Sequence, residues 1–140
     1  MGTRARIGFQ HADGHITSIY THWDGYPEHH GPILLNHYNT EGKIADLMAL
    51  GNLSVLAPEL GVEQNFDAPR EPAFAERTMC LAYGRDRHEV DQAAIDSPNL
   101  AMFEGECRQW TAEYGYLFSG KTWHQAAIPH IAKIVWSPII

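Results

Sequence analysis

The densest group of reactive side chains lies at residues 22–31, HWDGYPEHHG, with three histidines, an aspartate and a glutamate. His22, Asp24 and Glu28 belong to this segment, and His37 follows shortly after it. Imidazoles and carboxylates are suitable ligands for zinc, manganese or iron. A bound metal would lower the pKa of a water molecule while a carboxylate acted as base, so this chemistry would be metal-dependent hydrolysis.

A structural interpretation explains more of the residue types in this segment. The spacing matches no HExxH motif, and no second cluster of comparable density occurs elsewhere in the chain. Asp24 followed by Gly25 is typical of a tight turn, in which the aspartate accepts backbone N–H groups. We therefore predict a turn that can serve as a binding edge, and we keep the metal-dependent hydrolase as the alternative.

The neighbouring residues also fit the turn. Trp23 and Tyr26 would anchor the loop on the core of the protein. Glu28 would lie near the positive end of the following helix, where a negative charge is favourable. His29 and His30 would then be solvated surface residues. Under this interpretation the protein needs neither a metal nor another cofactor.

Recognition of a small anion is a further chemistry that the sequence indicates. Guanidinium groups offer paired donors, and aromatic rings offer faces on which a cation or a base can stack. The candidate ligand-binding residues are Arg4, Arg6, Trp23, Asp24, Tyr26, Tyr83, Arg85 and Arg87. A solvated charge cluster after a strand is the simpler explanation for residues 83–87.

The other reactive residues fit structural roles better. No Gly-Lys-Ser/Thr sequence follows the glycines near the N-terminus, so no phosphate loop is predicted. Cys80 lies in an apolar stretch and is expected to be buried, whereas Cys107 lies between charged residues and is expected to be exposed. Neither cysteine belongs to a CxxC pair.

Two strands and a turn would position the N-terminal candidates. Alternating apolar and polar residues predict strands at 4–10 and 16–23, joined by a two-residue turn at Asp13 and Gly14. This turn places Ile7 opposite Tyr20. Both would then lie on an inward face, and the arginines at positions 4 and 6 would lie on a half-open outer face.

Short elements and loops alternate in the rest of the chain. Helices are predicted to begin at residues 31–32 and to span residues 41–50, where Thr40 is a suitable N-cap and Gly51 a stop signal. The further expected elements are a loop at 61–76, a strand at 77–84, a loop at 85–99, an ambiguous segment or short helix at 100–110, a hairpin from 113–118 and 122–128, and a helix at 129–136.

Together these elements predict one α+β domain over residues 1–140. Its sheet would be largely antiparallel, with about five strands, and short helices would pack mainly on one face. The chain has 140 residues, of which 44% are hydrophobic, and this is enough for a buried core. The aromatic content also leads us to expect an exposed patch or sheet edge that supports a homo-oligomer.

Charge and hydropathy limit the partners. The formal net charge of −7 disfavours a protein that grips long duplex nucleic acid through its phosphates. A small nucleotide is compatible with this charge, because one or two local arginines suffice to bind it. No signal peptide or membrane span is expected, since no long apolar run occurs, and the cysteine content suits a reducing cytoplasm.

Parts of the chain resemble a group of small, mostly uncharacterised proteins encoded by phages and prophages. The shared features are a GTR start, an SIY-HWDGYP hairpin exit and an ALG-LS-L helix end, which occur here at 2–4, 18–27 and 49–56. CLAYGRDR at 80–87 and EYGYLF at 113–118 are similar to later segments of the same group. The resemblance implies an accessory phage gene, but it supplies no reaction and no catalytic residue.

Small accessory phage proteins often bind and disable a host defence. The resemblance therefore implies a non-enzymatic antagonist in the cytoplasm of the host cell, such as an anti-CRISPR protein or a nucleotide sponge. Its target would be either a host defence protein or a small nucleotide signal. An acidic protein can mimic nucleic acid toward a basic surface of a host protein, which slightly favours the protein target. The nucleotide version would use the arginines and aromatic residues named above.

Overall fold

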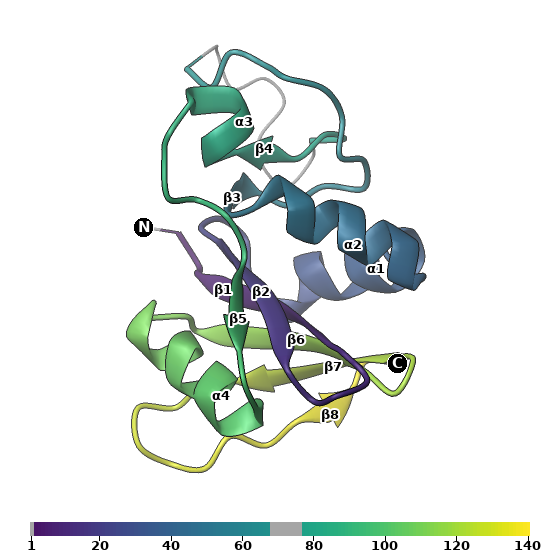
Figure 1. The fold of residues 1–140 in the computed structure, drawn as a ribbon, viewed down its shortest axis with the longest axis vertical. Coiled ribbons are helices and arrows are strands. Elements are labelled where there is room, and N and C mark those ends of the chain that lie inside the picture. The colour runs from purple at the N-terminus through teal and green to yellow at the C-terminus, as the bar shows by residue number, and fades with distance from the viewer. Residues whose placement is uncertain (1, 68–76) are drawn as a thin grey trace.

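The computed structural model describes residues 2–67 and 77–140, so the predicted loop at 61–76 lies partly outside the described residues. The elements in chain order are β1 (Ala5–Gln10), β2 (Ile16–Thr21), α1 (Pro27–His37), α2 (Glu41–Leu50), β3 (Leu53–Val55), β4 (Leu81–Ala82), α3 (Tyr83–Arg87), β5 (Ile95–Ser97), α4 (Leu100–Gln109), β6 (Tyr114–Ser119), β7 (Thr122–Ala127) and β8 (Ser137–Pro138). The strands form one sheet around which the helices are arranged (Figure 1). In the described part of the chain, no helix has the length and apolar character needed to cross a bilayer.

The first hairpin closes with a three-residue loop, not with the predicted two-residue turn. The backbone N–H of Gly14 donates to the carbonyl of His11 at 2.9 Å, and the N–H of His11 donates to the carbonyl of His15 at 2.9 Å. Gly14 has a φ of 96°, which glycine adopts without steric cost. A turn followed by a glycine with positive φ is the common way to build such a loop.

The longer loop shifts the strand register by one residue. Ile7 pairs with Ile19, and Arg6 pairs with Tyr20. Because side chains alternate along a strand, Tyr20 shares the face of Arg6 and not that of Ile7, so the predicted face of Tyr20 is wrong. The prediction of a half-open outer face is also wrong at Arg6, which is fully buried.

The α+β class is confirmed, but the sheet is larger than predicted and mixed. Among the described residues it has eight strands, seven of them in the order β4-β3-β2-β1-β6-β7-β8, and β5 pairs with β2 beside this path. The β1–β6 and β2–β3 pairs are parallel. Parallel neighbours are joined by long connections and leave no local turn signal, so the prediction of a largely antiparallel sheet missed them.

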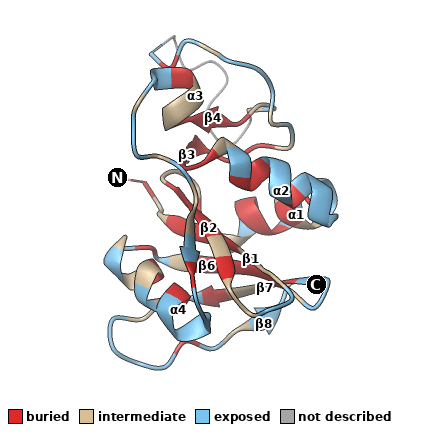
Figure 2. Ribbon diagram, in the orientation of Figure 1, coloured by how far each residue is buried: buried red, intermediate tan, exposed pale blue. Residues whose placement is uncertain are grey.

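Helices cover both faces of the sheet, which corrects the prediction that they pack mainly on one face. α1 contacts β7 and α2 contacts β2, over a core that includes Ile7, Ile19 and Trp123. α4 packs on the opposite face, through Phe103 and Cys107. Cys107 is therefore buried rather than exposed. Figure 2 shows this pattern of buried central strands and exposed outer helix surfaces.

Of the first two helices, α2 has the predicted bounds and α1 does not. α2 begins and ends as predicted, because the Thr40 hydroxyl accepts from the N–H of Lys43 at 3.2 Å and Gly51 ends the helix with a φ of 80°. α1 begins earlier than predicted, at Pro27. Proline suits this first helical position because its missing N–H would have no partner there. Pro32 lies inside α1 and not at its start.

Three further segments differ from their predictions. β4 covers only residues 81–82 of the strand predicted at 77–84, whose last two residues begin α3. The loop predicted at 85–99 contains the end of α3 and all of β5. The predicted C-terminal helix does not form, and the carbonyls of Pro129 and Ala132 accept hydrogen bonds from the guanidinium of Arg108. α4 and the second hairpin, β6–β7, form where the sequence places them.

Candidate functional site

Within the segment at 22–31, residues 22–26 form a turn between β2 and α1, and residues 27–31 are the first residues of α1. Asp24 adopts a left-handed φ of 57°, and Tyr26 is the N-cap residue of α1. The backbone N–H of Gly25 donates to the carbonyl of Thr3 at 2.8 Å, and the hydroxyl of Tyr116 donates to the carbonyl of Gly25 at 2.6 Å. These contacts support the structural interpretation, because the polar groups of the turn bond to backbone and core.

We expect Gly25→Ala to lower the free energy of unfolding by about 1–3 kcal/mol. A Cβ at this position would lie 2.7 Å from both the Cβ of Ala5 and the carbonyl oxygen of Thr3, so the backbone would have to shift. Urea unfolding followed by circular dichroism measures the change. Gly42→Ala in α2 is the matched control, because nothing lies within 4 Å of its Cβ position. Alanine there should stabilise by about 0.5–1 kcal/mol.

His29 and His30 are buried, which corrects the expectation that they are solvated. Their Nδ1 atoms lie 2.9 Å apart, and His30 Nε2 lies 2.9 Å from the hydroxyl oxygen of Thr21. Burial lowers the pKa of His29. Burial, together with the neighbouring His29, lowers the pKa of His30 well below its ordinary value. Both rings therefore act as neutral parts of the core.

The four residues of the hydrolase alternative do not converge. His22 Nδ1 lies 2.7 Å from the hydroxyl of Tyr20. His37 is exposed in the last turn of α1, whereas Glu28 lies in its first turn. Among the described residues, the histidine and carboxylate atoms close enough to share an ion belong to another part of the chain. The geometry therefore gives no support to a hydrolytic metal centre that includes Asp24 and these three residues.

Arg6, a predicted ligand-binding residue, has a structural role. It is buried between α4 and the sheet, where its Nε donates to the hydroxyl of Ser18 at 2.8 Å. Its guanidinium lies 5.1 Å from the ring centre of Trp110. Burial lowers the pKa of Arg6 to about 10. A side chain enclosed in this way does not meet a ligand from solution.

Arg85 is also structural. It donates to the carbonyls of Leu60 and Cys80, each at 2.8 Å, and to the buried carboxylate of Asp86 at 3.0 Å. The same carboxylate accepts the backbone N–H of Gln64 at 2.9 Å. Arg85 and Asp86 thus connect α3 to the segments before it, and their polar groups are used within the fold.

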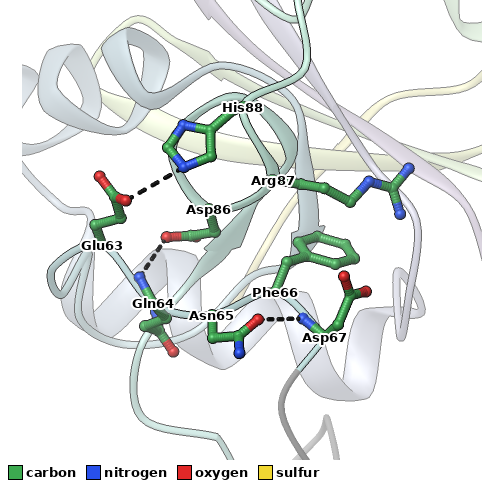
Figure 3. A pocket seen from close by; sticks show the side chains of 8 residues that line it. All are labelled: Glu63, Gln64, Asn65, Phe66, Asp67, Asp86, Arg87 and His88. Atoms are coloured by element: carbon green, nitrogen blue, oxygen red, sulfur yellow. Dashed lines mark hydrogen bonds and ion pairs between the residues drawn. The ribbon is translucent and has the colours of Figure 1, made fainter.

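The structure brings together three of the predicted ligand-binding residues near α3. Trp23 and Tyr83 pack against the cluster that contains Phe66. The guanidinium of Arg87 lies 4.6 Å from the ring centre of Phe66 and 5.3 Å from that of Tyr83. Phe66 and Arg87 line a hollow of about 550 Å³, which Figure 3 shows from close by.

The charges of this hollow do not favour a phosphate. Arg87 forms an ion pair with Glu89, and His88 Nε2 lies 3.4 Å from a carboxylate oxygen of Glu63. Asp67 adds a further carboxylate to the lining (Figure 3). The positive groups are therefore already paired, and a phosphate would meet carboxylates beside them.

A second cleft, of about 520 Å³, lies where the start of β1, the end of α4 and the segment after β7 meet. We call it the Arg4–Arg108 cleft. Its lining residues are Arg4, Arg108, Thr111, Ala112, Glu113, Ile128, Pro129 and His130. Of the predicted ligand-binding residues, Arg4 alone is part of this lining.

Both arginines of the Arg4–Arg108 cleft are held by neutral partners. Arg4 Nε donates to the carbonyl of Thr111 at 3.2 Å. Arg108 donates to the carbonyls of Pro129 at 3.2 Å and Ala132 at 2.7 Å. Within residues 2–67 and 77–140, neither guanidinium forms an ion pair with a carboxylate. Two oriented positive charges, not paired with a carboxylate, therefore line the cleft, together with the single carboxylate of Glu113.

The sequence does not identify Arg108 or His130 as candidates. No spacing signal could have done so, because the cleft joins distant parts of the chain, and Thr111 lies 107 positions after its partner Arg4.

In comparisons with known proteins, the chain matches no protein-family model, no curated protein and no solved structure.

Proposed function

We propose that this protein binds a small phosphate-bearing ligand of the nucleotide class in the Arg4–Arg108 cleft and holds it without transforming it. The observation that carries the proposal is the pair of guanidinium groups whose described partners are backbone carbonyls. Such partners do not neutralise the charge, and guanidinium groups bind phosphate through paired, charge-assisted hydrogen bonds. The carbonyls also orient both side chains in advance, which reduces the entropy lost on binding.

The surrounding charge favours a small anion over a polymer. The chain has a net charge of −7, so a long nucleic acid would be repelled beyond the cleft, whereas a single phosphate would meet the two arginines. Ile128 and Pro129 supply an apolar wall for a base or a ribose, and His130 adds a polar group.

The resemblance to phage-encoded accessory proteins supports a biological role for such binding. A protein that holds a nucleotide signal in the host-cell cytoplasm lowers the free concentration of that signal, and so antagonises the defence that it activates. This role needs affinity and abundance, but no turnover. The competing possibility is that the protein binds a host defence protein directly, and the experiments below distinguish the two targets.

Isothermal titration with inorganic phosphate, nucleoside monophosphates and cyclic dinucleotides tests the proposal. We expect one nucleotide per cleft and an affinity that falls with added salt. Arg4→Met and Arg108→Met should each weaken binding by about tenfold or more, since each removes a charge-assisted contact. Lys43→Met on α2 is the matched control, because it removes one positive charge on the other side of the sheet and should leave the affinity unchanged.

Equal nucleotide affinity in the wild type and in both arginine variants would contradict the proposal. Mass spectrometry of small molecules released from the purified protein, together with a pull-down from infected cells, distinguishes the two kinds of target. A host protein captured equally by the wild type and by both variants, with no nucleotide released, would favour the protein target instead.

A further inference from the structure

Two histidines meet at the tip of the β1–β2 hairpin. His11 and His15 flank the three-residue loop, and their rings stack with 4.0 Å between centroids and 8° between planes. The loop length creates this pair. A two-residue turn would shift the register by one and place His11 opposite Ile16, with the second histidine out of reach.

A carboxylate from a distant segment joins the two histidines. Asp96 in β5 pairs with Thr17 in β2, and the Thr17 hydroxyl donates to Asp96 Oδ1 at 2.6 Å. The same hydroxyl lies 2.8 Å from His11 Nε2. One ligand atom from each of His11, His15 and Asp96 lies within 4.8 Å of the other two.

Asp13 orients one of the imidazoles toward this carboxylate. Its Oδ1 lies 2.5 Å from His15 Nδ1, so Nδ1 carries the donated proton and Nε2 keeps its lone pair. His15 Nε2 lies 4.0 Å from Asp96 Oδ1. A carboxylate behind a histidine ligand is the usual outer partner at metal sites. The side chains of His15 and Asp96 are 36% and 69% exposed, so an ion can reach them from solution.

We propose that His11, His15 and Asp96 form a binding site for a divalent transition-metal ion of the zinc type. Two imidazoles and one carboxylate suit zinc, and the fourth position is open to water or to the Thr17 hydroxyl. Zinc–ligand distances of about 2.0–2.2 Å require the three atoms to approach one another by about 1 Å, which rotation of these accessible side chains provides. The bound ion joins the hairpin tip to β5.

Isothermal titration of the metal-free, tag-free full chain with zinc chloride tests the site. We expect one equivalent of zinc to bind, and His11→Gln, His15→Gln and Asp96→Asn each to weaken binding by about tenfold or more. His37→Gln removes an exposed histidine of α1 and should leave the affinity unchanged. A wild-type chain that binds no zinc, or a His15→Gln variant that binds as tightly as the wild type, would overturn the proposal.

Cobalt(II) gives a second readout that folding defects alone would not reproduce. Cobalt bound in place of zinc should show visible absorption bands, and these should be absent from His15→Gln.

Asp13→Ala should weaken zinc binding by about 10–100-fold. Asp13→Asn should restore most of the affinity, because its carbonyl oxygen still accepts from His15 Nδ1; unchanged binding by Asp13→Ala would overturn this positioning role. Arg4→Met should bind zinc normally, so the metal site and the anion cleft are tested separately.

Discussion

Trp123→Ala is expected to lower the free energy of unfolding by about 3–5 kcal/mol. Trp123 is 2% exposed, and its ring meets that of Phe118 edge to face with 5.4 Å between centroids. Its indole N–H donates to the carbonyl of Tyr38 at 2.8 Å, just after α1. Alanine would leave a cavity under α1 and a buried carbonyl without its donor, and both effects destabilise the fold.

Urea unfolding followed by circular dichroism gives the free energies for this comparison. Trp123→Phe is the informative companion variant, because it keeps an aromatic ring in the core and removes the indole N–H. We expect it to lose about 1–3 kcal/mol, close to the cost of an unpaired buried carbonyl. If Trp123→Ala lost no more than Trp123→Phe, the packing of α1 on β7 would contribute far less than the structure indicates.

Local signals predicted the elements whose contacts are local. α2 begins after Thr40 and ends at Gly51, because cap residues act within one turn of a helix. The second hairpin forms around residues 120–121, which both have positive φ. The first hairpin forms too, but a glycine at position 14 is compatible with two-residue and three-residue loops. Strand pairing decides between them, and with it the face on which each side chain lies.

Contacts between distant residues could not be predicted in this way. The parallel pairing of β1 with β6 and the docking of α4 on the second face leave no periodic signal in either segment. In the sequence, a buried guanidinium such as that of Arg6 looks the same as an exposed one, since Ser18 and Trp110 become its partners only in the fold. The Arg4–Arg108 cleft likewise exists only in the folded chain, so the sequence identifies Arg4 but not Arg108.

The buried histidine pair in α1 has a consequence for stability that the sequence alone did not indicate. An Nδ1–Nδ1 hydrogen bond between His29 and His30 needs one donor and one acceptor, so it is lost when both rings are protonated. His30 also bonds to Thr21 inside the core. Burial lowers the pKa of both imidazoles in the folded chain, whereas in the unfolded chain they titrate near the ordinary value of about 6.5.

The free energy of unfolding is therefore expected to fall as the pH drops below about 6.5. Below that pH the unfolded chain binds protons at His29 and His30 that the folded chain does not accept, so acid favours unfolding. Above it both states are neutral at these rings, and their contribution does not change. Each histidine should add up to about 1.4 kcal/mol per pH unit to the slope, until the folded chain is protonated as well.

Urea unfolding at a series of pH values from 7.5 downward measures this slope, and two matched substitutions assign it. His30→Gln keeps a polar side chain beside Thr21 but does not titrate, so its slope should be shallower by up to about 1.4 kcal/mol per pH unit. His37→Gln changes an exposed histidine of the same helix and should leave the slope unchanged. Equal slopes in the wild type and in His30→Gln would mean that His30 accepts a proton in the folded chain, contrary to its enclosed position between Thr21 and Tyr116.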